Sequence, residues 1–169
     1  MDTLIHLFGL CAMVSLFLIY QQKSRKNIIL CKLTADIFWI AHYALLGAVG
    51  GIIPNAVGFF REIVFFNRGK RKWASTPIWV AVFILINLTL GLRTFSVWYN
   101  IIPIAASSLV TVSLWINKPN LTKIITIPVC ISFLIYDIFV HSYMGMINES
   151  ISLISIFIYF ARNGKEEKQ

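Results

Sequence analysis

Long apolar segments, separated by short polar or glycine-containing connections, dominate the pattern along the chain. The segments lie at about residues 4–20, 28–49, 52–66, 77–92, 97–117, 124–144 and 147–161. Most of them reach the roughly 17–25 residues that a helix needs to cross a bilayer. Lipid offers no hydrogen-bond partner to an open sheet edge, so spanning segments of this kind are helical. The pattern therefore predicts an all-α membrane protein with seven transmembrane helices.

Composition agrees with a membrane protein and excludes several other classes. Of the 169 residues, 58% are hydrophobic and 13% are charged, whereas a soluble domain carries about 25% charged residues. The net charge of +8 comes from residues in the short connections and not from a basic face interleaved with aromatics, so the expected partner is the lipid bilayer and not nucleic acid. The three cysteines lie in apolar segments without metal-ligand spacing, and we expect no metal and no cofactor.

The basic residues are distributed unevenly among the connections. Lysines and arginines occur at positions 23–26, 68–72 and 118–123 and in the C-terminal tail, while the alternate connections carry Arg93 alone. Positively charged connections stay in the cytoplasm. This asymmetry predicts a multi-pass protein of a bacterial inner membrane, with the N-terminus outside and the C-terminus cytoplasmic.

The second half of the chain repeats the pattern of the first. A shift of about 95 residues places Phe38 on Phe133 and Gly50 on Gly145, and aligns the segment boundaries. The chain is then a single transmembrane domain with repeat one at about 1–72, a linker helix at about 76–95, repeat two at about 96–162 and a tail at 163–169. Because one helix separates two three-helix units, the units are parallel and form a 3-1-3 arrangement.

One stretch resembles a known superfamily. The second and third segments carry a pattern similar to that of SWEET and PQ-loop (MtN3-like) transporters, in the residues Trp39, Tyr43, Gly47, Pro54, Asn55 and Gly58. Within that superfamily, residues 21–66 look most like the YgjV-type bacterial inner membrane proteins. The resemblance implies a transporter scaffold in which one asparagine of each repeat faces the solute. Asn55 matches the first asparagine, and the second falls at Ser150, beside Asn148 and Glu149.

Four charged residues interrupt the second and third segments. Lys32 and Asp36 are four residues apart and share a helix face, and Arg61 and Glu62 lie at a similar depth on the next, antiparallel segment. We expect Asp36 to pair with Arg61, because unpaired charges at membrane depth are costly. The cluster is interpreted either as a structural lock between the two helices or as an inner gate.

Other polar and aromatic residues indicate a solute path. Under the 95-residue shift, His42 corresponds to Asp137, so the two are expected across the path from each other, where a histidine suits proton coupling. The alternative is that His42 caps a neighbouring carbonyl and Asp137 faces outer water. Trp39 either stacks on a ring-shaped solute or packs between helices. We expect Trp39, His42, Asn55 and Asp137 to line one central cavity, with Asn148 near the same level.

These features favour a small-solute transporter or facilitator that works by alternating access between two three-helix bundles. The alternative is a sensor or assembly factor that uses the same scaffold without transport. The catalytic motifs of zinc hydrolases, serine hydrolases and nucleotide-binding enzymes are absent from the sequence, so an enzyme is not expected. The expected partners are a small polar solute and lipid, and the sequence leaves open whether the protein forms a homo-oligomer.

Overall fold

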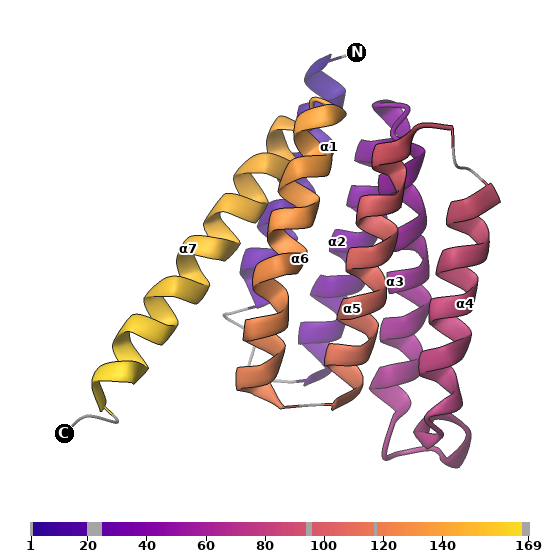
Figure 1. Ribbon diagram of the computed structural model, residues 1–169, viewed down its shortest axis with the longest axis vertical. Helices are drawn as coiled ribbons and strands as arrows, with labels where there is room; N and C mark the ends of the chain where they lie inside the picture. The colour runs from indigo at the N-terminus through magenta and orange to yellow at the C-terminus, as the bar shows by residue number, and fades with distance from the viewer. Residues whose placement is uncertain (1, 20–24, 94–95, 117, 167–169) are drawn as a thin grey trace.

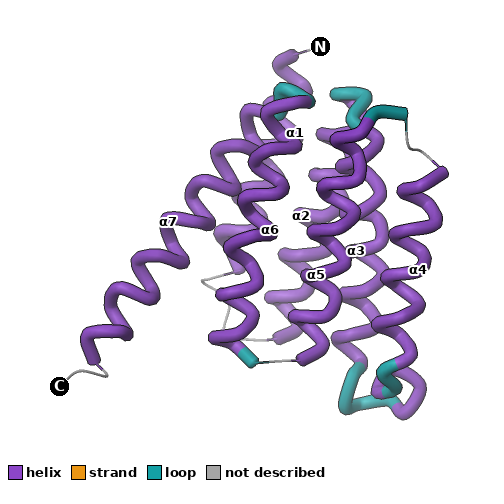
Figure 2. The backbone as a smooth tube through the Cα atoms, viewed as in Figure 1, coloured by secondary structure: helices purple, strands orange, loops and turns teal. Residues whose placement is uncertain are grey.

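The computed structural model describes residues 2–19, 25–93, 96–116 and 118–166, and all regular structure in these ranges is helical (Figures 1 and 2). Two short 3₁₀ turns, η1 (Lys72–Ser75) and η2 (Trp98–Asn100), precede α4 and α5. The α-helices are α1 (Asp2–Ile19), α2 (Arg25–Leu45), α3 (Val49–Asn67), α4 (Ile78–Arg93), α5 (Ile101–Ile116), α6 (Pro119–Phe139) and α7 (Tyr143–Glu166).

Two turns lie several residues earlier than the hydrophobic pattern predicts. The turn between α2 and α3 is at residues 46–48, so Gly50 and Gly51 lie inside α3 and do not form the break. The turn between α6 and α7 is at residues 140–142, inside the predicted sixth segment. Residues 46–48 are Leu, Gly and Ala, residues 140–142 are Val, His and Ser, and both turns lie within longer apolar stretches, so hydropathy alone does not mark them. Each depends instead on one residue with a positive φ, 68° at Gly47 and 55° at His141.

The two turns have the same backbone hydrogen bonds. The amide of Ala48 donates to the carbonyl of Tyr43, and the amide of Ser142 donates to that of Asp137. The helices before the turns, α2 and α6, each contain 21 residues. Tyr43 and Asp137 are 94 residues apart, as are the two ends of these helices and the starts of α3 and α7. The hairpins α2–α3 and α6–α7 therefore match under a shift of 94 residues, which we call the 94-residue register, and the 95-residue shift is wrong.

This correction changes which residues are equivalent. Asp137 corresponds to Tyr43 and not to His42, whose equivalent is Tyr136. Asn55 corresponds to Glu149 and not to Ser150. The four charged positions correspond to Thr126, Cys130, Ser155 and Ile156.

Helix contacts follow the same register. The helices form two sets, α1–α3 and α5–α7. Within each set consecutive helices pack together, α1 on α2 and α2 on α3 in the first, α5 on α6 and α6 on α7 in the second. Between the two sets, α3 contacts α5 and α1 contacts α7, which are equivalent contacts under the 94-residue register. Helix α4 packs on α3 and α5. Helix α7 runs away from the other helices toward the C-terminus (Figure 1).

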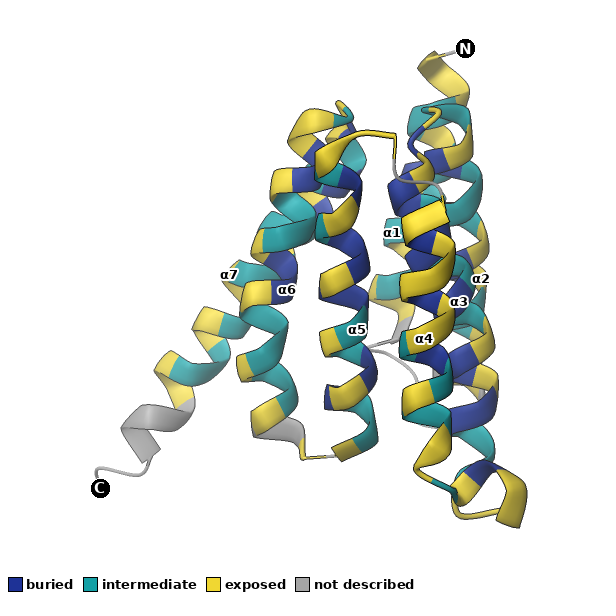
Figure 3. Cartoon of the chain, turned by 45° about the vertical axis from the view of Figure 1, so that its right-hand side comes forward, coloured by how far each residue is buried: buried dark blue, intermediate teal, exposed yellow. Residues whose placement is uncertain are grey.

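Four helical stretches are long and apolar enough to cross a membrane, and α1 and α4 are shorter apolar helices. The four are Val49–Asn67, Trp98–Ile116, Leu121–Phe139 and Tyr143–Arg162. They differ in how far they are enclosed: 56% of the apolar window of the first is buried, against 11% of the last. Figure 3 shows exposed residues over much of α4 and α7. An exposed face made of isoleucine, leucine and phenylalanine is suited to lipid.

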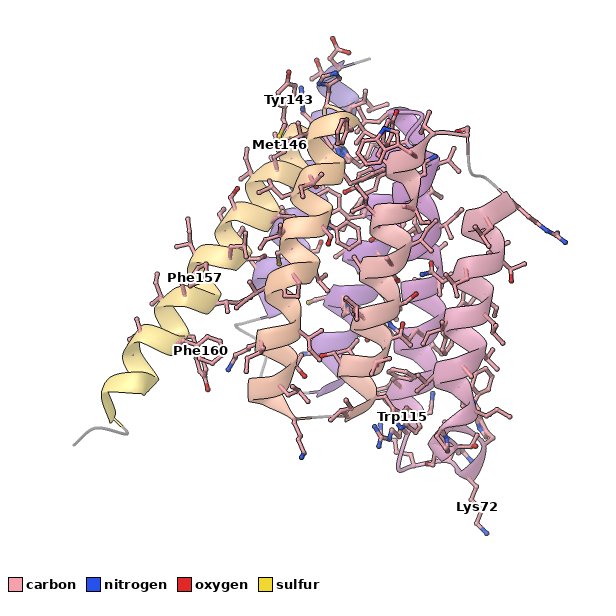
Figure 4. All side chains as sticks on the ribbon, viewed as in Figure 1. Lys72, Trp115, Tyr143, Met146, Phe157 and Phe160 are labelled. Carbon is pink, nitrogen blue, oxygen red and sulfur yellow. The ribbon has the colours of Figure 1, made fainter. Side chains whose placement is uncertain are left out.

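Positive charge gathers at one end of the molecule. The α2–α3 and α6–α7 turns lie at the end where the chain begins, and the connection containing η1 lies at the opposite end (Figure 1). Lys72 extends from that opposite end (Figure 4). In the same connection, the guanidinium of Arg68 lies 3.9 Å from the centre of the Trp115 ring, and its Nη1 donates to the Trp115 carbonyl. This end therefore combines aromatic and basic side chains, as membrane interfaces do.

Candidate functional site

A cavity of about 140 Å³ lies between the hairpin α2–α3 and the hairpin α6–α7, and we call it the inner cavity. Its wall comes from α1, α2, α3, α6 and α7 and consists of Leu16, Lys32, Asp36, Trp39, Tyr43, Asn55, Phe133, Asn148 and Glu149. Two pairs in this wall are equivalent under the 94-residue register: Trp39 with Phe133, and Asn55 with Glu149. Residues of both hairpins thus face each other across the cavity.

The two asparagines of the wall use their amide groups as donors. Asn55 Nδ2 donates to the carbonyl of Gly51, 2.8 Å away on the same helix. Asn148 Nδ2 donates to Glu149 Oε1 at 3.0 Å. A carbonyl and a carboxylate can only accept, so the orientation of both amides is fixed. The predicted positions of Trp39, Asn55 and Asn148 on one cavity agree with this geometry.

The four charged residues Lys32, Asp36, Arg61 and Glu62 form the charge cluster, and all but Lys32 are buried. The ammonium of Lys32 lies 3.5 Å from Glu62 Oε1 and 4.0 Å from Asp36 Oδ1. Arg61 Nη2 lies 3.3 Å from the same Glu62 oxygen. Among the described residues no ion pair joins Asp36 to Arg61, so the prediction of that direct pair is wrong. Glu62 is the common partner of the two cations, because it projects between them.

Arg61 also joins the two halves of the molecule. Its Nη1 donates to Thr111 Oγ1 at 3.0 Å and reaches the carbonyl of Ser107 at 3.5 Å, both on α5. Hydrogen bonds made by a charged donor are stronger than those between neutral groups. The charge cluster therefore holds α3 against α5 as well as against α2.

His42 does not line the inner cavity. It is fully buried, with Nδ1 2.8 Å from the carbonyl of Ile5 and Nε2 2.8 Å from Ser142 Oγ. The carbonyl requires a proton on Nδ1, so Nε2 accepts from the serine hydroxyl. That hydroxyl oxygen in turn accepts from the amide of Gly145 at 3.2 Å. His42 therefore caps a carbonyl of α1 and accepts a hydrogen bond from the α6–α7 turn. The expectation that it lines the solute path is wrong.

Asp137 is also fully buried and lies behind the cavity wall. Tyr43 donates its hydroxyl to Asp137 Oδ1 at 2.8 Å, so these equivalent residues of the two repeats meet directly. Gly145 packs against the carboxylate so closely that an added Cβ would lie 2.3 Å from Oδ2. Asp137 thus does not line the inner cavity and is not exposed to outer water, and no direct His42–Asp137 pair forms among the described residues.

A second cavity, of about 330 Å³, lies at the end of the molecule near the N-terminus, and we call it the outer cavity. Its wall comes from the two equivalent turns and from η2, and includes Gly47, Tyr99, Asn100 and His141. The rings of Tyr43, Tyr136 and Tyr99 follow one another at centroid distances of 6.0 and 6.2 Å. Tyr43 lines the inner cavity, Tyr99 lines the outer one, and the fully buried Tyr136 lies between them. Aromatic side chains therefore separate the two cavities.

The model of the Imp-YgjV family, bacterial inner membrane proteins, matches residues 3–167. The chain belongs to this family. The match covers nearly the whole chain and agrees with the YgjV-type resemblance of residues 21–66. The protein is thus a bacterial inner membrane protein, and its long apolar helices are those of an integral membrane protein. Neither the curated proteins nor the solved structures compared with this Imp-YgjV chain include a match.

Two features of the site were not found by sequence reasoning. The 95-residue shift pairs Phe133 with Phe38 and Ser150 with Asn55, so it does not identify Phe133 as the equivalent of Trp39 or Glu149 as the equivalent of Asn55. The signal was present in the sequence, since a 94-residue shift also pairs Gly51 with Gly145. Within the described part of the chain, no three His, Cys, Asp or Glu side chains converge as metal ligands do.

Proposed function

We propose that the protein transports or facilitates the passage of a small polar solute, by alternating access between the units α1–α3 and α5–α7. All seven helices cross the membrane in this proposal, with α4 as the linker of a 3-1-3 arrangement like that of SWEET transporters. The observation that carries it is the inner cavity, whose wall pairs Trp39 with Phe133 and Asn55 with Glu149 across the two units. Polar groups at membrane depth that surround a cavity are typical of a solute path.

The two cavities support a closed outer side in this conformation. The three tyrosines between them would have to separate before a solute could pass from the outer to the inner cavity. The equivalent contacts α3–α5 and α1–α7 are the surfaces along which the two units would rock. Arg61 crosses one of these surfaces, which supports the gate interpretation of the charge cluster.

The alternative function is a sensor or assembly factor without transport. The observation in its favour is that several polar residues form static bonds between helices: His42 to α1 and to the α6–α7 turn, and Arg61 to α5. A protein that never opens would have the same bonds. The two functions differ in whether the inner cavity becomes accessible from both sides of the membrane.

Cysteine accessibility distinguishes these functions. Phe133→Cys is introduced into a protein whose Cys11, Cys31 and Cys130 are replaced by alanine, and membrane-impermeant thiol reagents are applied to each face of sealed vesicles. We expect labelling from both faces, because the cavity opens to each in turn. Ser96→Cys, in the outer cavity wall, is the positive control for the N-terminal side, and Ile154→Cys, on the exposed face of α7, is the lipid-facing negative control. Labelling of Phe133→Cys from one face or from neither contradicts alternating access.

The orientation of the chain is tested separately. The proposed topology places the N-terminus outside and the C-terminus in the cytoplasm. A reporter active only in the cytoplasm, fused after Gln169, should be active, and the same reporter fused at Arg93 should be silent. Activity at Arg93 and silence after Gln169 would reverse the orientation.

A further inference from the structure

We propose that the inner cavity selects a small organic ammonium ion, a solute with one protonated amine and few other atoms. This inference rests on the proposed transport function and names the class of its solute. An asparagine amide can both donate and accept, so by itself it would also suit a neutral or zwitterionic solute. The contacts around the cavity occupy one N–H of each asparagine amide.

Several donors of the cavity wall already have partners. The amide nitrogens of Asn55 and Asn148 are directed to the Gly51 carbonyl and to Glu149. The Tyr43 hydroxyl donates to Asp137, behind the wall. The ammonium of Lys32 lies between Glu62 and Asp36. One N–H of each amide remains, and the wall also offers a solute several acceptors, the Oδ1 atoms of the two asparagines and the carboxylates.

One of these acceptors is unsatisfied. Asp36 lines the cavity, its side chain is 8% exposed, and its Oδ2 is buried without a hydrogen-bond partner among the described residues. Buried polar atoms nearly always have a partner, so an unsatisfied oxygen in a cavity wall is an acceptor that a ligand can use. A carboxylate oxygen requires a donor, and an ammonium group supplies three.

The charge balance of the site points the same way. The two cations and two anions of the charge cluster cancel one another. In its ionised form Glu149 adds a negative charge to the opposite wall, and among the described residues no Lys or Arg pairs with it. An unbalanced charge in a site of low dielectric is costly. A monovalent cation in the cavity neutralises it, whereas an anion would add a second uncompensated charge.

The remaining wall suits the rest of such a solute. Trp39 and Phe133 present aromatic rings from the two hairpins, and aromatic faces attract ammonium groups. The volume of about 140 Å³ is below the roughly 300–1,000 Å³ of sites for drug-sized ligands. The cavity therefore fits an amine that carries a short carbon chain.

Binding to the purified protein tests the inference. Thermal unfolding is followed with ethylammonium chloride, 1-propanol, sodium propionate and sodium chloride, the three salts at matched ionic strength. A ligand that binds the native state raises the unfolding temperature. We expect a concentration-dependent rise with ethylammonium alone, and a loss of at least tenfold in its affinity in Glu149→Gln and in Asp36→Asn. Asp2→Asn, which removes an exposed carboxylate far from the cavity, is the matched control and should bind as the unchanged protein does.

A gain of affinity guards against variants that fail to fold. Asn55→Asp places a second carboxylate opposite Glu149 and should bind ethylammonium more tightly. An equal shift with propionate or propanol, no shift with any probe, or unchanged affinity in Glu149→Gln and Asn55→Asp overturns the assignment of the solute class.

Failure of this inference differs from failure of the proposed function. If Phe133→Cys is labelled from both faces but propionate binds in place of ethylammonium, transport stands and the solute class is wrong. If ethylammonium binds but labelling occurs from one face, the cavity is the ligand site of a sensor. In that case the ammonium assignment stands and transport is wrong.

Discussion

The hairpins α2–α3 and α6–α7 share their backbone and differ in their chemistry. Their turns have the same hydrogen bonds, and α2 and α6 have the same length. The first hairpin contains the charge cluster, and at the equivalent positions of the second are Thr126, Cys130, Ser155 and Ile156. The backbone of the repeat therefore depends on turn geometry and not on the buried charges, which belong to one half alone.

The difference has a consequence for packing. Arg61 fastens α3 to α5 through Thr111. The residue equivalent to Arg61 is Ser155, which is exposed. Helix α7 meets α1 where Gly9 packs against Met144, near the start of α7, and then runs away from the bundle (Figure 1). Helix α3 is thus hydrogen-bonded to α5 through a residue far from its turn, whereas α7 contacts α1 near the α6–α7 turn.

Replacement of Arg61 should produce the largest loss of stability. Arg61→Leu leaves Glu62, among the described residues, with Lys32 as its one ion-pair partner and removes the donor to Thr111. Breaking a buried pair costs about 3–5 kcal/mol, so we expect a strong loss of folded protein, measured by size-exclusion chromatography of detergent extracts. Ser155→Leu, the same change at the equivalent position, should leave the yield unaltered. Equal losses in both variants would show that the two halves are held alike.

The glycines after the turns should give the next largest effect. An added Cβ would lie 2.6 Å from Tyr43 Cγ at Gly51 and 2.3 Å from Asp137 Oδ2 at Gly145. Overpacking of this kind costs about 1–3 kcal/mol, so Gly51→Ala and Gly145→Ala should each lower the unfolding temperature. Gly58→Ala is the control, because its Cβ would meet its nearest neighbour, Arg61 Nη2, at 3.4 Å. A drop in Gly58→Ala as large as in the other two would mean that helix conformation, not close packing, is responsible.

Loss of the Tyr43 hydroxyl, which bonds to Asp137 of the other hairpin, should lower stability somewhat less. Tyr43→Phe removes the donor to Asp137 and leaves a buried carboxylate oxygen without it, at a cost of about 1–3 kcal/mol. Tyr136→Phe is the matched control, because the Tyr136 hydroxyl is buried without a hydrogen-bond partner among the described residues. We expect unfolding in denaturing detergent to separate the two variants. If Tyr136→Phe destabilises as much as Tyr43→Phe, the Tyr43–Asp137 bond is not the link between the repeats.

The sequence predicts the helices and the charge cluster because both depend on composition. A long apolar run needs a helix in lipid, and four charges on neighbouring helices need one another. The partners within the cluster were predicted less well. Counting residues along the helices places Asp36 and Arg61 at a similar depth. It cannot show that the Glu62 side chain lies between Lys32 and Arg61.

The repeat register could not be fixed from apolar residues alone. Isoleucine and phenylalanine are frequent throughout the chain, so they match by chance, and a shift of 95 residues aligns even more of them with identical residues than a shift of 94. The decisive features are the residues with positive φ, and these differ in type, Gly47 in one turn and His141 in the other. The one-residue error made Asp137 the equivalent of His42. It thereby assigned to the solute path two residues that form hydrogen bonds between helices.

The turns themselves should give the smallest effect, and one of opposite sign in the two halves. Gly47 has a φ of 68° and His141 a φ of 55°, a conformation that costs a residue with a side chain about 1–2 kcal/mol. Nothing lies within 4 Å of a Cβ added at Gly47, so Gly47→Ala should lower stability by about 1 kcal/mol through backbone conformation alone. His141→Gly relieves the same conformation, but glycine also loses more freedom on folding. We therefore expect a net gain of a few tenths of a kcal/mol or less, measured as a rise in the unfolding midpoint. A loss of stability in His141→Gly would mean that the His141 side chain, and not only its backbone, supports the second turn, and the two hairpins would then differ in their turns as well as in their charges.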